Sequence, residues 1–162
     1  MLIISISVID TTAAPPAPNI NQCNNKNSLS AVKVQDLSFG DFEASIAGTI
    51  TVTPAGTRSS SGPVLAGGTV TAAAFDVSNS RSGCEIYPVQ ITLPATAILT
   101  TGAVDMTASA FSSTPATQLT LSPIPGQATR VYVGATLNSG TNQAGGIYTT
   151  AVPFDVTFDH VP

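Results

Sequence analysis

The segment "AVPFDVTFDHV", residues 151–161, alternates between apolar and polar side chains over most of its length. Its apolar positions are Val152, Phe154, Val156 and Phe158. A period of two residues is typical of a strand with one face on a core and the other in solvent. The segment therefore predicts a strand near the end of the chain. Pro153 cannot donate to a strand ladder, which favours an edge or a bulge at that point.

The same alternation occurs in four earlier runs, "GTITVTP" (48–54), "VQITLP" (89–94), "QLTLSP" (118–123) and "RVYVGATL" (130–137). Segments rich in Gly, Pro, Asn and Ser separate these runs and predict turns. Short alternating strands with frequent turn signals are typical of an all-β sandwich. The predicted core faces comprise Ile50, Val52, Val89, Ile91, Leu93, Leu119, Leu121, Val131, Val133, Ala135 and Leu137.

The composition narrows the classes of function. Five Lys and Arg residues stand against nine Asp and Glu, so the chain lacks the basic stripe that binds nucleic acid. No run approaches the roughly 20 apolar residues that span a bilayer. The two cysteines, Cys23 and Cys84, have neither metal-binding nor redox spacing. We expect them to form a disulfide in an oxidising, extracellular setting, with two buried free thiols as the alternative.

The N-terminus has its own organisation. In "MLIISISVID", residues 1–10, a period of two places Leu2, Ile4, Ile6 and Val8 on one face. Residues 11–20, "TTAAPPAPNI", form a proline-rich tether. Residues 21–162 then form the predicted sandwich domain.

Three interpretations of residues 1–10 compete: a secretory-signal remnant, a strand of the chain's own sheet, and a strand donated to a neighbouring subunit. A signal would begin with positive charge, which this run lacks. A proline-rich tether is a semi-rigid spacer that suits reaching outward. We therefore expect donation to a neighbour, with pairing inside the chain left open. Such head-to-tail contacts build filaments unless they close into a ring.

Five segments carry a resemblance to a known family: "DLSFGDF" (36–42), "GTITVTPAGTRSSSG" (48–62), "GGTVTAAAFDVS" (67–78), "YPVQITLPATAILTTG" (87–102) and "NQAGGIYTTAVPFDVTF" (142–158). Over roughly residues 30–160 the chain resembles DUF4402, a bacterial secreted family without an assigned function. The Gly146-x-Tyr148 pair is also similar to spore coat protein U and chaperone–usher pilins. The resemblance implies an incomplete immunoglobulin-like, pilin-like sandwich that a donated N-terminal strand completes.

These observations together predict a structural subunit of an extracellular bacterial filament, exported through the periplasm and bound to identical subunits. A periplasmic chaperone and an outer-membrane usher are further partners that the pilin resemblance implies. The donor residues would be Leu2, Ile4, Ile6 and Val8, and the acceptor groove would comprise Val32, Val34, Val152, Phe154, Val156 and Phe158. The alternative is a monomeric or tip-located sandwich module that binds a glycan or another surface ligand.

We predict no enzymatic activity, cofactor or metal. A lone histidine, His160, is a poor basis for catalysis or for a metal site. The pairs Asp41 with Glu43 and Asp155 with Asp159 are spaced to share a strand face, so we expect solvent-facing charges.

Two further residues have structural predictions. We expect Tyr148 to be packed at a corner of the sandwich with its hydroxyl tied down. Asp36 shifts the phase of the alternation before Leu37, so we expect a bulge or a turn there.

Overall fold

A computed structural model describes residues 2–6, 28–80, 88–150 and 152–161. All the secondary-structure elements assigned to these residues are strands, so the all-β prediction is confirmed. The strands are β1 (Leu2–Ile6), β2 (Leu29–Gln35), β3 (Leu37–Glu43), β4 (Gly48–Val52), β5 (Arg58–Ser61), β6 (Val64–Leu65), β7 (Val70–Thr71), β8 (Ala73–Asn79), β9 (Val89–Thr92), β10 (Thr96–Thr100), β11 (Asp105–Thr114), β12 (Gln118–Leu119), β13 (Thr129–Ser139), β14 (Ile147–Thr150) and β15 (Thr157–His160).

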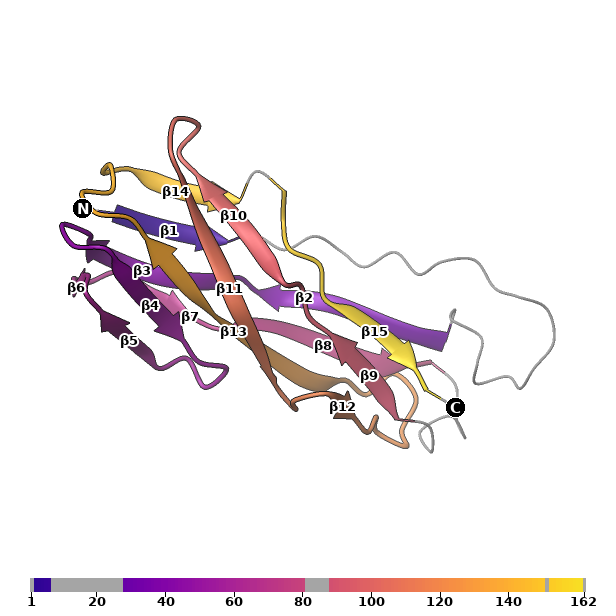
Figure 1. The fold of residues 1–162 in the computed structure, drawn as a ribbon. Coiled ribbons are helices and arrows are strands. Elements are labelled where there is room, and N and C mark those ends of the chain that lie inside the picture. The colour runs from indigo at the N-terminus through magenta and orange to yellow at the C-terminus, as the bar shows by residue number, and fades with distance from the viewer. Residues whose placement is uncertain (1, 7–27, 81–87, 151, 162) are drawn as a thin grey trace.

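The strands form two curled sheets (Figure 1). The larger one has the order β2-β8-β13-β11-β10-β14-β1-β3-β6, with β4, β5 and β7 attached beside that path. The smaller one has the order β12-β9-β15. The long strand β13 pairs with β11 on one side, and with β8 and then β4 on the other. β13 therefore lies at the centre of the larger sheet and contacts strands on both of its sides.

The core includes the side chains that alternation predicts. Val131, Val133, Ala135 and Leu137 of β13 are buried, as are Ile50 and Val52 of β4. Val89, Ile91 and Leu119 of the smaller sheet join the same apolar cluster with Leu121, which follows β12, and Leu93 is partly buried against it. Two aromatic contacts hold the last part of the chain in this core: Phe75 with Phe158 at 5.8 Å and Phe111 with Phe154 at 4.9 Å between ring centroids.

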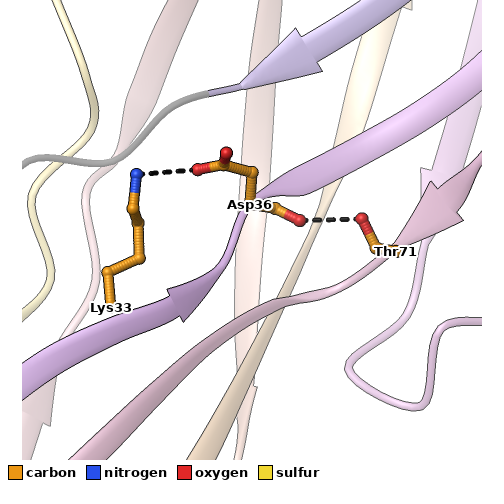
Figure 2. A network of polar contacts seen from close by, with 3 residues as sticks. All are labelled: Lys33, Asp36 and Thr71. Atoms are coloured by element: carbon orange, nitrogen blue, oxygen red, sulfur yellow. Dashed lines mark hydrogen bonds and ion pairs between the residues drawn. The ribbon is translucent and has the colours of Figure 1, made fainter.

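The strands β2 and β3 follow each other in one extended segment, which is interrupted at Asp36 (Figure 2). Lys33 Nζ lies 2.8 Å from Asp36 Oδ1, and Thr71 Oγ1 donates to the Asp36 carbonyl at 2.7 Å. The register with β8 shifts between Lys33 and Gln35. Asp36 therefore stands at the junction where the chain leaves β8 and continues beside β7, in agreement with the predicted bulge or turn.

A second irregularity lies inside β3. Gly40 has φ +68°, and the register between β3 and β1 shifts at this point. Arg58 Nη1 donates to the carbonyls of Phe39 at 2.9 Å and Asp41 at 3.0 Å, which holds the bulge in place. The bulge places Phe42 on the same face as Leu37 and Phe39, and Asp41 on the opposite face. There residues 66–68 cover Asp41, whose N–H donates to the Gly67 carbonyl at 3.0 Å, and Asp41 is only 2% exposed. The prediction of a solvent-facing Asp41 was wrong for this reason.

The last part of the chain divides between the sheets. β14 pairs with β10 in the larger sheet, and β15 pairs with β9 in the smaller one. Phe154, Val156 and Phe158 are buried as the alternation predicts, but Val152 is 75% exposed. Val152 departs from the pattern because it precedes Pro153 in the segment where the chain crosses from one sheet to the other.

Candidate functional site: the slot between β3 and β14

The strand β1 lies between β3 and β14 of the same chain (Figure 1). It is antiparallel to β3, with Leu2 opposite Phe42 and Ile6 opposite Leu37. It is parallel to β14, with Ile4 opposite Tyr148. Five residues at the start of the chain therefore connect two strands that are separated by about a hundred residues of sequence. We call the space that β1 fills the β1 slot.

The β1 slot is flanked by strands that are paired on their outer sides. β3 pairs with β6 and β7 on the side away from β1, and β14 pairs with β10. Without β1, the facing backbone groups of β3 and β14 would lose their ladder partners, and unpaired buried backbone groups are costly. The strand β1 thus fills an interior position of the sheet. In the sequence, the 22 residues 7–28 separate it from β2.

Both walls of the slot carry core side chains. Leu37, Phe39 and Phe42 of β3 and Tyr148 of β14 are each at most 1% exposed. Asp41, also on β3, is buried as well but is polar. Its Oδ1 has no hydrogen-bond partner within the described part of the chain. Opening the slot would therefore expose a mainly apolar surface.

Tyr148 links β14 to the preceding loop through two hydrogen bonds. Its hydroxyl donates to the Ala144 carbonyl at 2.8 Å and accepts from Gln143 Nε2 at 2.9 Å. The Gln143 backbone N–H donates to the Ala44 carbonyl at 3.1 Å, which links this loop to the segment after β3. The predicted packing of Tyr148 with a tied hydroxyl is confirmed, and its loop connects the two walls of the slot at one end.

The slot has a continuation in the direction in which β1 points. β2 precedes β3 in the chain and β15 follows β14, and the two strands are in contact with each other. Within the described ranges, β2 pairs only with β8, and β15 pairs only with β9. Each strand therefore has one edge without a ladder partner among these residues.

The predicted acceptor residues lie on this continuation. Val32 and Val34 are on the outward face of β2, 54% and 45% exposed. Phe154, Val156 and Phe158 are in the core beside or within β15. The structure thus brings the predicted strands together, while the assignment of an acceptor function to these residues stays a prediction.

The predicted acceptor groove did not include the β3 wall, formed by Leu37, Phe39 and Phe42. The signal was present in "DLSFGDF", but the Gly40 bulge breaks the alternation and concealed the continuous apolar face. Of the predicted donor residues, Leu2, Ile4 and Ile6 lie in β1, whereas Val8 falls outside the described residues. The tether and both cysteines, Cys23 and Cys84, also lie outside them.

The described residues contain no group of three or more His, Cys, Asp and Glu side chains placed to hold a metal ion. They also contain no helix long and apolar enough to cross a membrane.

Comparison with known proteins finds no match among curated proteins or solved structures. One family model matches residues 29–159, a range that begins at β2, includes both walls of the β1 slot and omits β1 itself. That model is described as a domain of unknown function, DUF4402, and because it covers most of the chain, the protein belongs to this family.

Proposed function

We propose that this chain is the structural subunit of an extracellular bacterial filament, in which residues 1–10 of one subunit fill the β1 slot of the next. The acceptor would be an incomplete immunoglobulin-like sandwich, completed by the donated strand. Identical subunits would be the main partners, and a periplasmic chaperone with an outer-membrane usher would deliver them to the cell surface.

The observation that carries the proposal is the origin of β1. The family match begins at residue 29, so both slot walls belong to the family domain and the strand between them comes from outside it. A domain built with a vacant interior strand position has two unsatisfied edges. Strand addition from another chain satisfies such edges with backbone hydrogen bonds and places alternate side chains in pockets.

The segment that joins β1 to β2 is longer than the arrangement within one chain requires. From the end of β1 opposite Leu37, the chain must return to Leu29, a distance of roughly 25 Å at strand spacing. Residues 7–28 could extend to roughly 70 Å. Since the same segment makes the same contacts in its own slot or in a neighbour's, subunit concentration and linker stiffness decide between them.

The edges of β2 and β15 support a donor longer than β1. A strand that continues past Ile6 in the same direction would run beside the edges of β2 and β15. Residues 7–10 include Val8, which continues the alternation of Leu2, Ile4 and Ile6. A ten-residue donor would therefore bridge the two sheets of the acceptor, and its affinity would exceed that of the five residues of β1 alone.

Deletion of residues 1–10 tests the proposal. We expect the full-length protein to form filaments visible by electron microscopy at high concentration and the deletion variant to remain monomeric. The physical reason is that the variant has an acceptor slot and no donor strand. Filaments formed by the deletion variant would overturn the proposal.

A point variant keeps the chain length constant. Ile4→Asp introduces a charge at the centre of β1 and is expected to abolish filaments, because a charge at an interior strand position is costly to bury. Ser5→Ala, one position later in the same strand, is the matched control and should form filaments like the wild type. Equal filament yields from both variants would contradict the proposed role of this strand.

A further inference from the structure

A solvent-open cavity of about 560 Å³ lies where the end of β2 and the segment around β7 meet β13 and the turn between β4 and β5. Its volume falls within the roughly 300–1,000 Å³ of small-molecule binding sites. The cavity contains no residue of β1, β14 or β15, so it is separate from the β1 slot. It is lined by neutral side chains, which include Gln35, Pro54, Val70, Thr71, Thr114 and Tyr132.

Tyr132 supplies an aromatic face. Its side chain is 37% exposed, and it is the one aromatic residue among the exposed large hydrophobic residues of the described chain. Its position in β13 is opposite Thr114 on one side and Ala74 on the other. Arg130, two residues earlier in β13, interacts electrostatically with Tyr132 and is held by Asp76 at 2.7 Å.

The polar groups of the lining are amides and hydroxyls. Gln35 offers both a donor and an acceptor, and Thr114 offers a hydroxyl. Thr71 Oγ1 donates its proton to the Asp36 carbonyl at 2.7 Å, which leaves its oxygen free to accept (Figure 2). No lining residue is charged, so a phosphate or carboxylate would find no counter-charge among them.

We propose that this cavity binds a neutral saccharide, with the apolar face of one sugar ring stacked on Tyr132. The ring hydroxyls would be met by Gln35, Thr71 and Thr114, and the C–H groups by Tyr132, Pro54 and Val70. A purely apolar ligand would desolvate the amide and hydroxyl groups without giving them partners. A sugar ring has both an apolar face and hydroxyls, and so matches both parts of this lining.

The cavity is present whether β1 fills its own slot or a neighbour's. Saccharide binding therefore does not depend on the proposed filament. In a filament each subunit would present one such site. Weak single-site binding would then add up along the filament when several sites engage one surface.

The test is a titration of the full-length protein, labelled with ¹⁵N and kept below the concentration at which it forms filaments, against neutral trisaccharides of glucose, galactose, mannose and N-acetylglucosamine, with a sialylated and a sulfated trisaccharide as charged controls. We expect at least one to produce saturable amide shifts at Gln35, Thr71 and Tyr132 with a millimolar dissociation constant. Tyr132→Ala should weaken binding about fivefold or more, whereas Tyr132→Phe should retain it, because stacking needs the ring and not the hydroxyl.

Two further variants guard against a folding artefact. Gln35→Ala changes an exposed side chain at the end of β2 and should also weaken binding. Ile124→Ala removes another exposed apolar side chain, away from the cavity, and should bind like the wild type. The proposal is overturned if no trisaccharide gives saturable shifts at tens of millimolar, if binding survives both Tyr132→Ala and Gln35→Ala, or if only sialylated or sulfated sugars bind.

Discussion

The strands β1 and β13 both occupy interior positions of the larger sheet, yet they are held there differently. β13 has eleven residues and pairs with β11, β8 and β4, all of which lie inside the family match. β1 has five residues, pairs with β3 and β14 alone among the described strands, and lies outside that match. The long central strand is thus part of the family domain, whereas the short strand from outside it is the one for which we propose exchange between subunits.

Removal of β1 should cause a large loss of stability that an added peptide can reverse. Deletion of residues 1–10 is expected to lower the free energy of unfolding by several kcal/mol, because two strand edges and the side chains of Phe42 and Tyr148 become exposed. A synthetic peptide of residues 1–10 should restore the melting temperature in a dose-dependent way. Calorimetry with and without the peptide measures both effects.

Leu137→Ala is the matched experiment on β13. Leu137 is fully buried, and its truncation should cost about 2–5 kcal/mol by leaving a cavity. No added peptide should recover this loss. If the peptide rescues neither variant, the contrast between an exchangeable strand and a fixed one fails.

Gly68 and Gly56 allow the β3 wall to be probed. Both have positive φ, +82° and +76°, so replacement by alanine strains each backbone by about 1–2 kcal/mol. A Cβ at Gly68 would lie 2.7 Å from the Asp41 carboxylate, whereas one at Gly56 would meet nothing within 4 Å. Gly68→Ala should therefore be more destabilising than Gly56→Ala in urea unfolding, and it should also weaken peptide binding to the deletion variant. Equal losses would show that the β3 wall tolerates displacement.

Tyr148→Phe tests the β14 wall. The change removes a hydroxyl that donates to the Ala144 carbonyl and accepts from Gln143, and should cost about 1–2 kcal/mol. The loss should appear as faster hydrogen exchange in the loop between β13 and β14. Unchanged exchange in that loop would mean that the hydroxyl contributes nothing to the closure of this end of the slot.

The smallest effect concerns an ion pair beside β13. The hydrogen bond from Arg130 holds the pKa of Asp76 below its usual value. A lowered pKa in the folded state gives stability that is present above the unfolded pKa, about 3.9, and lost as the pH falls through the folded value. Asp76→Asn should thus be slightly less stable than the wild type at pH 7, with the difference shrinking below about pH 4. A constant difference across this range would exclude the ion pair as its cause. The pair is partly exposed, so the effect is small.

Much of the fold could be predicted from local pattern, and the exceptions have specific causes. The apolar faces of β4 and β13 follow from alternation because each strand is regular over its whole length. Asp41 departs from the expected exposure because residues 66–68 cover it, and Val152 departs because the chain crosses between the sheets at Pro153. Sequence analysis placed the acceptor groove on β2 and the last strand, whereas β1 itself lies between β3 and β14.

The sequence by itself determined that the chain is all-β, which faces of the regular strands are buried, and that a strand begins at residue 2. Those properties depend on the period of two along the backbone, which is local. Only the tertiary structure decided that β1 lies between β3 and β14 and that the cavity beside Tyr132 draws its lining from several strands. Strand partners and cavities are set by contacts between residues far apart in the chain, and no local pattern encodes which two edges meet.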